Sequence, residues 1–426
     1  MKELSLLKMI QIAILFAATF VMGACSGVKG ESAGDDDSTM TMDGSGGGST
    51  DSGDDGSGDG TDDGGSGGMR LDDGDEDDGG EDSGDWGDPS FDPDCSQGGA
   101  FLTGAERHDD VAAAVATSAA GDVITVCPGS FITHVDVVHE LTIEGTGDPE
   151  ATVLDGDGQP GSIVSASGSF TLTLERLTLR DGRGTLGSNG STGGGALYAD
   201  GASLDLRSLR FEGNGGDYGS AIASNGHVDG TWLTIVDGAS NSVSVSSSTG
   251  SASLSLSNTV IRGQDEDVCI AATGIPLSLD DVEINGCPTT PISVSGVTLS
   301  LSGVELSDAG PGRSGGIEVF ASDGVIEDLR VSGGDATVGG ALMVTQPGDS
   351  ELVLRGGELS GNSGRKASAV FLEFQPPDGA TVVFDGVDFG DGGDEPTLAW
   401  ETVNGVGGEL QLSGVSVLVC TRAGCE

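Results

Sequence analysis

The sequence predicts an all-β fold, a right-handed parallel β-helix, which is a solenoid of about twelve coils with a short N-terminal capping helix. One short phrase occurs ten times between Leu172 and Val417: apolar-x-apolar, a few small or polar residues, another apolar residue, and then Gly, Asn or Asp. Successive copies begin about 22 to 32 residues apart, which is typical of solenoids. Alternation with a period of two inside each copy indicates strands rather than helices.

Each copy accounts for most of one coil. The copies are LTLERLTLRDG from Leu172, LDLRSLRFEGN from Leu204, GTWLTIVDG from Gly230, LSLSNTVIRG from Leu254, LSLDDVEING from Leu277, LSLSGVELSD from Leu299, VIEDLRVSGG from Val325, LVLRGGELSGN from Leu352, VVFDGVDFGDG from Val382 and LQLSGVSVLV from Leu410. Most copies hold two short strands, and a third apolar run, such as GGALYA from Gly194, precedes the next copy. Gly at the positive-φ corners then explains much of the count of 77 Gly.

Alignment of neighbouring copies predicts a register. If the copy LTLERLTLRDG is laid beside LDLRSLRFEGN, Glu175 lies beside Arg207 and Arg180 lies beside Glu212. Opposite charges one rung apart would add a modest stabilisation, about 0.2–1 kcal/mol for each pair.

The two ends of a solenoid expose unpaired strand edges, so each end needs a cover. Residues 109–120 (DDVAAAVATSAA) predict the capping helix, because Asp109 or Asp110 would cap its start, Ala favours helix and Gly121 would stop it. The other end shows a weaker signal, a short segment from Cys420 to Cys425.

Residues 1–24 have the features of a secretory signal peptide, with Lys2 and Lys8 before an apolar run. The ending VMGAC resembles a bacterial lipobox, with Met where Leu is usual. The resemblance to lipoproteins implies that Cys25 is acylated, with chains such as palmitate, and anchors the exported chain in a membrane. Ser26 is not the Asp that holds many lipoproteins at the inner membrane, so the outer membrane or cell surface of a Gram-negative bacterium is expected. The alternative is an ordinary cleaved signal with a Cys by chance.

Residues 25–94 join the lipidated Cys to a stretch of almost only Gly, Asp, Ser and Thr. This composition offers nothing to bury, so we expect a disordered acidic tether. The run DDGDEDDGGED from Asp72 resembles calcium-binding loops only in composition, because the D-x-[DN]-x-[DN]-G…E spacing is missing. Weak Ca²⁺ association is therefore expected there, and no cofactor.

Six Cys follow the lipidated one, and an even number in an exported chain favours disulfides. They are Cys95, Cys127, Cys269, Cys287, Cys420 and Cys425. Sequence alone does not choose the pairing, although proximity favours neighbours along the chain. Zinc is the rival explanation, but no C-x-x-C pair and no clustered His accompany these Cys, so no metal site is expected.

The formal net charge is −52, of which about −21 falls in residues 26–94 and about −32 in residues 95–426, the predicted β-helix domain. Such a surface excludes nucleic acid and anionic lipid headgroups as partners, because nothing would neutralise the phosphates. Neutral glycans, cationic proteins and divalent ions stay compatible with it.

A family resemblance agrees with the repeat. Residues 112–131 (AAAVATSAAGDVITVCPGSF), followed by LTIEGTG and ATVLDGDG, resemble the opening of pectin-lyase-like right-handed β-helix proteins. GGAL followed by FEGN at Phe211, and a second GGAL followed by LSGN at Leu359, resemble polymorphic outer-membrane-protein repeats. The resemblance covers nearly all of residues 100–426 and implies the fold, but this fold hosts lyases, hydrolases, esterases, adhesins and passive surface proteins.

The catalytic motifs of pectinolytic β-helix enzymes are missing: there is no NTD…DD…GHG series and no RxPxxR. Asp155 and Asp157 in LDGDG, with Asp181 in the next coil, are the acidic candidates for a hydrolase, which needs carboxylates about 6.5–9.5 Å apart if it inverts. Asp-Gly is also ordinary turn chemistry, and that interpretation is favoured.

Basic and aromatic residues give two further candidates on adjacent coils. A positive patch for a uronate or sulfate would contain Arg176, Arg180, Arg183, Arg207 and Arg210. Inter-coil ion pairs with Glu175 and Glu212 are the favoured alternative. Tyr198, Tyr218 and Trp232 would make a short strip for stacking on sugar rings, or would simply pack. The aromatic residues predicted to lie in the core are Phe211, Phe371, Phe374, Phe384 and Phe389.

The sequence thus predicts a surface lipoprotein whose β-helix is a non-enzymatic, adhesin-like structural or binding module for glycan or protein. The alternative is a divergent polysaccharide lyase or glycoside hydrolase, with Asp155, Asp157, Asp181, Arg180 and Arg210 as its candidate residues.

Overall fold

A computed structural model describes residues 93–103, 106–186, 191–263, 268–377, 379–390, 397–403, 408–415, 419–421 and 424–425. The signal sequence, Cys25 and the acidic tether up to residue 92, including the run from Asp72, lie outside the described residues. The predictions made for them stay predictions.

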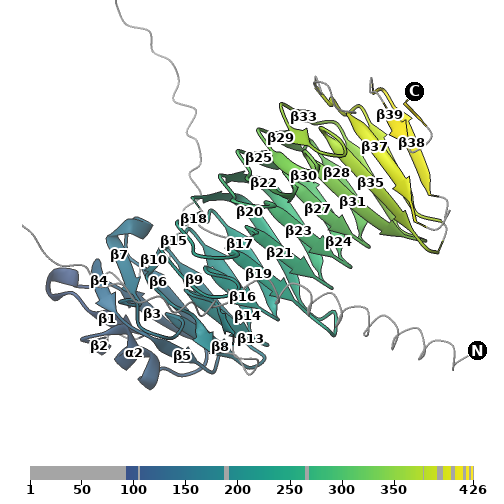
Figure 1. The fold of residues 1–426 in the computed structure, drawn as a ribbon. Coiled ribbons are helices and arrows are strands. Elements are labelled where there is room, and N and C mark those ends of the chain that lie inside the picture. Colours follow the sequence, from purple (N-terminus) through teal and green to yellow (C-terminus); the bar gives the residue numbers. More distant parts are fainter. Residues whose placement is uncertain are drawn as a thin grey trace, which may run out of the picture. The chain divides into compact units, whose positions relative to one another are not determined.

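The described residues form a parallel β-helix of about 11 turns, as the repeat predicts (Figure 1). A repeating coil gives two strands to a 22-stranded sheet and one strand to a 13-stranded sheet. In one coil these are β14 (Ser203–Arg207), β15 (Arg210–Glu212) and β16 (Ile222–Ser224). Each strand pairs in parallel with its counterpart in the next coil, so three rows of strands follow the solenoid axis.

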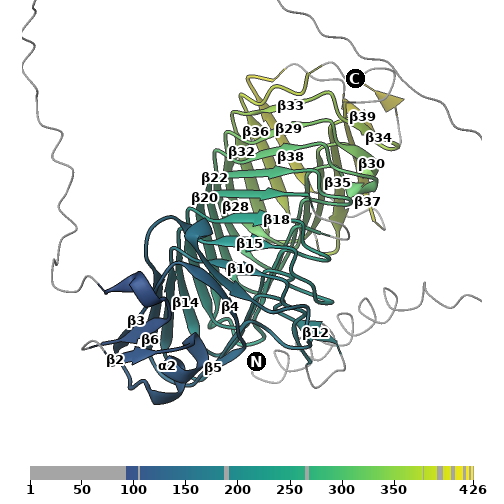
Figure 2. The ribbon, with the colours of Figure 1, turned by 90° about the vertical axis from the view of Figure 1, so that its left-hand side faces the viewer.

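The strands of each row are as follows. The first row contains β3 (Asp122–Val126), β6 (Leu141–Gly145), β9 (Thr171–Glu175), β14, β17 (His227–Thr231), β20 (Ser253–Arg262), β22 (Pro276–Asn285), β24 (Thr298–Ser302), β28 (Asp323–Glu327), β32 (Glu351–Arg355), β36 (Thr381–Asp385) and β38 (Glu409–Ser413). The second row, labelled in Figure 2, contains β4 (Gly129–Ile132), β7 (Thr152–Asp155), β10 (Thr178–Arg180), β15, β18 (Thr234–Val236), the second halves of β20 and β22, β25 (Glu305–Ser307), β29 (Arg330–Ser332) and β33 (Glu358–Ser360). The third row contains β5 (Val135–Val137), β8 (Val164–Ser167), β13 (Leu197–Asp200), β16, β19 (Val243–Ser246), β21 (Ile270–Thr273), β23 (Ile292–Ser295), β27 (Ile317–Phe320), β31 (Leu342–Pro347), β35 (Val370–Gln375), β37 (Leu398–Thr402) and β39 (Val419–Thr421), which pairs with the antiparallel β40 (Gly424–Cys425).

A residue in the left-handed conformation turns the chain between the first and second rows. In three consecutive coils this corner is held by Trp232 (φ 59°), Asn258 (φ 48°) and Asp281 (φ 51°). The three lie beside one another, because the residues that precede them pair in register in β17, β20 and β22. We call this series of corner positions the corner row.

Alternate apolar residues of the repeats fill the interior, in a continuous core of buried residues from Ala100 to Leu398. The predicted core aromatics are all buried, and Phe211, Phe374, Phe384 and Phe389 belong to this core. Phe371 instead joins a small separate cluster with Met343 and Ala367. That cluster lies where a 3-stranded sheet of β26 (Gly312–Ser314), β30 (Asp335–Gly339) and β34 (Ser363–Gly364) packs beside β31 and β35.

The predicted register is correct: Glu175 pairs with Arg207, and Arg180 with Glu212, across parallel strands. The expected ion pairs between them are not found among the described residues. Arg207 binds Asp205 on its own strand at 2.6 Å, and Arg180 reaches back one coil to Asp155 at 2.7 Å. Buried leucines fix the register, whereas an exposed guanidinium pairs with whichever carboxylate its side chain reaches.

Helix α2 (Val111–Thr117) lies at the N-terminal end, where it contacts β1 (Ala100–Leu102), β2 (Glu106–His108), β3 and β5. The Asp110 carboxylate accepts a hydrogen bond from the Ala113 backbone at 2.6 Å, and so caps the first turn. The apolar side of the helix is buried, and consists of Val111, Ala114 and Val115. The helix is shorter than residues 109–120, because Ser118 is extended and ends it before Gly121.

Two disulfides form between neighbours along the chain. Cys95 bonds Cys127, with 5.4 Å between their Cα atoms, and Cys269 bonds Cys287, with 6.1 Å. Cys420 and Cys425 are backbone partners in the β39–β40 pair. The first bridge ties the start of the described chain to the first coil.

In the portion of the chain that the structure describes, no helix has the length and apolar character needed to cross a bilayer.

Candidate functional site

Two groups of side chains on neighbouring coils are candidates for a functional site. The Arg180 cluster consists of Asp155, Arg180, Asp181, Arg210 and Glu212, from β7, β10, β15 and the turn after β10. The Trp232 groove follows it along the second row, and its lining residues are Trp232, Leu233, Thr234, Asn258, Thr259, Val260, Asp281 and Glu283.

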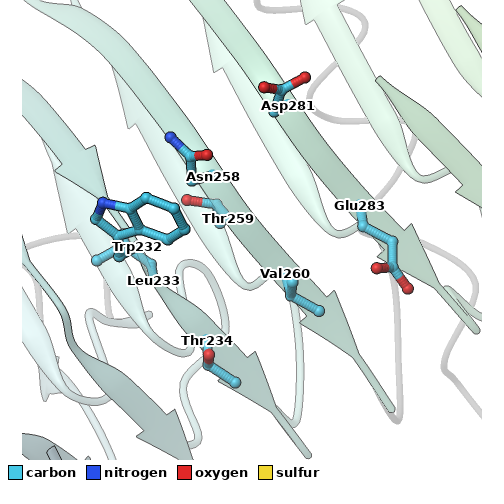
Figure 3. A pocket seen from close by; sticks show the side chains of 8 residues that line it. All are labelled: Trp232, Leu233, Thr234, Asn258, Thr259, Val260, Asp281 and Glu283. Carbon is cyan, nitrogen blue, oxygen red and sulfur yellow. The ribbon is translucent and has the colours of Figure 1, made fainter. Parts of the chain in front are cut away.

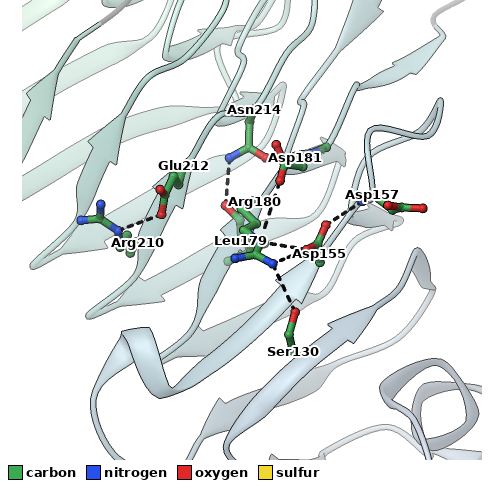
Figure 4. Close-up of polar contacts among 10 residues, drawn as sticks. Ser130, Asp155, Asp157, Leu179, Arg180, Asp181, Arg210, Glu212 and Asn214 are labelled. Atoms are coloured by element: carbon green, nitrogen blue, oxygen red, sulfur yellow. Dashed lines mark hydrogen bonds and ion pairs between the residues drawn. The ribbon is translucent and has the colours of Figure 1, made fainter. Parts of the chain in front are cut away.

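The centre of the Arg180 cluster is a closed ion pair (Figure 4). Arg180 lies beside Asp155 in the parallel pairing of β10 with β7. Its Nε and Nη2 donate to Oδ2 of Asp155 at 2.8 and 2.7 Å, and the side chain of Asp155 is only 12% exposed. This hydrogen bond raises the pKa of Arg180 above its usual value. The Arg180 guanidinium is therefore already hydrogen-bonded to a carboxylate of the protein.

The acidic candidates belong to turns. Oδ1 of Asp155 accepts a hydrogen bond from the Asp157 backbone at 2.7 Å, so both carboxylate oxygens of Asp155 are engaged. Asp157 (φ 50°) and Asp181 (φ 59°) adopt the left-handed conformation that Asp tolerates well. This is the arrangement expected of Asp-Gly turns, and it leaves Asp155 without a free oxygen for acid or base chemistry.

The other arginines of the predicted positive patch also bind carboxylates. Arg210 binds Glu212 at 3.2 Å, and Arg176 binds both Glu144, at 3.2 Å, and Glu175. The hydrogen bond that the Arg207 guanidinium donates to the Asp205 carboxylate raises the pKa of Arg207. The positive charges of the patch are therefore neutralised by carboxylates of the protein itself. Arg183 is the exception, since no ion pair is found for it among the described residues. A uronate or sulfate would have to displace these partners to bind.

Asn214 lies under the cluster and was not singled out from the sequence, although it is the last residue of the FEGN motif. It is 2% exposed; its Oδ1 accepts from the Gly182 backbone at 3.0 Å, and its Nδ2 donates to the Leu179 carbonyl at 2.9 Å. Asn362, in the LSGN motif, makes the same two contacts one coil back, with Gly334 and Val331. The Asn of these motifs therefore holds the turn of the preceding coil.

The Trp232 groove is open to solvent, with a volume of approximately 330 Å³ (Figure 3). Trp232 is 62% exposed although it is large and apolar. Its backbone is also in the left-handed region, which is rare for a bulky residue and costs about 1–3 kcal/mol. Its backbone N–H donates to the Ser257 carbonyl at 3.1 Å, so the corner is held while the indole is left outside.

The groove is built on two series of stacked side chains. The corner row supplies Trp232, Asn258 and Asp281, and the second row supplies Thr234, Val260 and Glu283. In Figure 3 the Trp232 ring extends over the neighbouring coil, toward Asn258 and Thr259. An exposed aromatic face beside hydroxyl, amide and carboxylate groups is the usual composition of a sugar-binding surface.

The three aromatic residues that the sequence placed in one strip do not lie together. Tyr198 is on β13 in the third row, and Tyr218 forms an isolated bridge with Gly193 nearby. Burial, and then the neighbouring Tyr218, raise the pKa of Tyr198. Trp232 instead lies on the corner row, between the first and second rows of strands. The sequence assigns these residues to neighbouring coils, but it does not show which face of the coil each side chain occupies.

Histidines and other metal-binding side chains provide no further candidate. Nδ1 of His134 lies 2.8 Å from the Ser162 carbonyl, and Nε2 lies 3.2 Å from the Gly156 carbonyl, so the ring links two turns. Within the described ranges, no group of three or more His, Cys, Asp and Glu side chains is arranged to hold a metal ion.

Comparison with known proteins adds little on function. No protein-family model matches the sequence. No curated protein sequence matches it either. Among solved structures, the periplasmic alginate epimerase AlgG is similar with a TM-score of 0.39 and 9% identity, over 70% of this chain and 85% of that chain. At this level of similarity no site residue is transferred from the epimerase to this chain.

Proposed function

We propose that this protein is an adhesin-like surface lipoprotein whose β-helix binds a glycan through the Trp232 groove, without a catalytic role. The observation that carries the proposal is the exposed indole of Trp232, held in a strained left-handed corner beside Asn258 and Asp281, whose side chains have no partner among the described residues. Strain of this kind persists where the surrounding structure imposes it, and it accumulates at binding sites. An indole face then supplies the stacking surface that a sugar ring needs.

The state of the Arg180 cluster supports binding rather than cleavage. A hydrolase needs one carboxylate free to transfer a proton, and a lyase needs a cation free to bind the uronate. Asp155 and Arg180 instead bind each other. Among the described residues that line the groove, Asp281 has the one carboxylate without an ion-pair partner, and a single carboxylate does not make the pair of a glycosidase.

The proposed location is the outer face of a Gram-negative cell, through acyl chains on Cys25 and a tether over residues 26–94. An extended acidic segment would keep the β-helix away from a negatively charged membrane surface. Replacement of Cys25 by Ser tests this: the full chain, expressed in a Gram-negative host, should move from the membrane fraction to the soluble fraction. Retention of the C25S variant in the membrane would contradict lipid anchoring.

Binding and cleavage are separated by one experiment on the full chain. The protein is incubated with neutral and acidic polysaccharides, with and without Ca²⁺, and polymer length is followed by size-exclusion chromatography. We expect unchanged polymer length and co-elution with one class of polymer. Shortened polymer would overturn the proposal in favour of a divergent polysaccharide lyase or hydrolase.

A pair of variants then locates the binding. Trp232→Ala should weaken binding about fivefold or more, by analogy with the stacking of a nucleic-acid base on an aromatic side chain, which contributes about 1–3 kcal/mol. Ile132→Ala is the matched control, because Ile132 is 68% exposed and is not part of the groove. Equal losses in the two variants would place the glycan elsewhere.

A further inference from the structure

The Trp232 groove carries an uncompensated negative charge. Two carboxylates line it, those of Asp281 and Glu283. Glu283 is neutralised by Arg262 at 2.7 Å. For the carboxylate of Asp281, no ion pair or hydrogen bond is found in the described part of the chain, and Asp281 is exposed. A ligand in the groove therefore meets one free carboxylate and no free cation from the lining residues.

The free carboxylate and the indole lie at a distance that about two linked sugar units span. Trp232, Asn258 and Asp281 occupy successive positions of the corner row. Parallel strands lie about 4.8 Å apart, so Trp232 and Asp281 are roughly 10 Å apart along the row. Asn258 stands between them, and no partner for its amide is found among the described residues (Figure 3). The groove thus presents an aromatic face, an amide and a carboxylate in that order.

The backbone sets the position of Asp281. The residue is left-handed, and the next position of the corner row is Gly303. A Cβ built on Gly303 would lie 2.5 Å from Oδ1 of Asp281, so a larger residue there would displace the end of this side chain from its present position. The same pairing recurs at Asp328, whose Oδ1 would lie 2.7 Å from a Cβ on Gly356. On the corner row Asp328 lies between two Gly residues and has no aromatic neighbour. It therefore serves as a control for the effect of the Asp281 carboxylate.

We infer that the groove selects an amino sugar, a glycan unit with a protonated amine, over neutral and acidic sugars; this inference rests on the proposed glycan binding at the same site. A cation is attracted by the face of an indole and by a carboxylate. Trp232 and Asp281 provide these two groups to successive sugar units, and the Asn258 amide between them is placed to accept or donate to a ring hydroxyl. A uronate would bring a second negative charge to Asp281, and Arg262 is already bound to Glu283.

The test measures affinities of the full chain for four tetrasaccharides: glucosamine, N-acetylglucosamine, glucose and galacturonate oligomers. The pH is held where the glucosamine amine is protonated. We expect the glucosamine tetramer to bind most tightly and the galacturonate tetramer least. Asp281→Asn should weaken glucosamine binding about threefold to tenfold and leave N-acetylglucosamine binding unchanged, because the amide keeps the shape and removes the charge.

Asp328→Asn separates the groove from the general negative charge of the protein. This control removes the same charge from the same kind of corner, outside the groove, and should leave the affinity for glucosamine oligomers unchanged. If both variants weaken binding equally, the preference comes from the net charge of −52 and the inference is wrong. If wild type binds neutral and amino sugars equally, the inference fails and the proposed function stands. If no tetramer binds, both fail.

Discussion

The Arg180 cluster and the Trp232 groove lie on neighbouring coils of one surface, and they differ in what their side chains bind. In the cluster, Arg180 and Arg210 are paired with carboxylates, and so are Arg176 and Arg207 beside it. In the groove, Trp232 is 62% exposed and Asp281 stands without a counter-ion among the described residues. In this protein, the region with many charged side chains is structural, because those charges pair with one another. The candidate binding site is the region with few charged side chains beside one exposed aromatic ring.

The comparison shows why charged residues on adjacent coils are weak indicators of a site. Stacked coils place side chains about 4.8 Å apart, so a guanidinium always finds a carboxylate in an acidic protein. The left-handed backbone at Trp232 belongs to the corner that each coil makes, but the exposed indole has no such local explanation, because Asn258, Asp281 and Gly303 hold the same position in the following coils. Three changes test the contrast, and they follow from the largest expected effect to the smallest.

Removal of Asn214 should give the largest loss of stability. Asn214→Ala leaves the buried backbone N–H of Gly182 without its partner and removes one of the hydrogen bonds that the Leu179 carbonyl accepts. The cost is about 2–4 kcal/mol, and hydrogen exchange at Gly182 should rise with it. Glycan binding should stay unchanged, because the variant lies under the closed cluster.

Asn362→Ala is the control for this prediction. Asn362 makes equivalent contacts, but it is only half-buried. Its loss should therefore lower the free energy of unfolding by less than the loss of Asn214 does. An equal or larger effect at Asn362 would contradict burial as the cause.

Replacement of Arg180 should have an intermediate effect. Arg180→Ala leaves the Asp155 carboxylate, 12% exposed, without its cation, at a cost of about 1–2 kcal/mol after allowance for the exposure of the guanidinium. Arg180→Lys should recover only part of it, since Lys lacks the two adjacent donors that reach Oδ2. Thermal unfolding measures both variants. An Arg180→Ala protein as stable as wild type would show that the pair is not structural.

Much of the fold could be predicted, because the inward residues of each copy must stack on those of the next. The Leu-x-Leu copies fixed both the strands and the register, including the neighbours of Glu175 and Arg180. The partners of those charged residues could not be predicted, because an exposed Arg chooses among several carboxylates within reach at little difference in free energy. Arg207 binds Asp205, which is two residues away in sequence.

The groove could be predicted only in part. The sequence makes Trp232 a candidate for stacking, with plain packing as the favoured alternative, but groups it with Tyr198 and Tyr218, which belong to another face of the solenoid. The sequence places residues on the same coil; which corner each occupies depends on the lengths of irregular turns. Asn258 and Asp281 gave no signal of their own, since Asn and Asp at a turn are ordinary. Asn258 and Asp281 become candidates for glycan binding only because the structure aligns them with Trp232 on the corner row.

The smallest effect concerns the corner row itself, where Arg176 (φ 53°) and Trp232 (φ 59°) share the same strained conformation. Gly relieves that strain in both, at the cost of a more flexible unfolded chain. Trp232→Gly should therefore stabilise the protein by up to about 1 kcal/mol while it removes glycan binding, because the exposed indole contributes little to the core.

Arg176→Gly should act in the opposite direction. This change relieves the same strain, but it also removes a hydrogen bond to the Gly145 carbonyl at 3.0 Å and the ion pairs with Glu144 and Glu175. We expect a net loss of about 1 kcal/mol, so thermal unfolding should rank Trp232→Gly above wild type and Arg176→Gly below it. A Trp232→Gly protein less stable than wild type would mean that contacts of the indole with the coil offset the strain at Trp232, and that the strain needs no ligand to explain it.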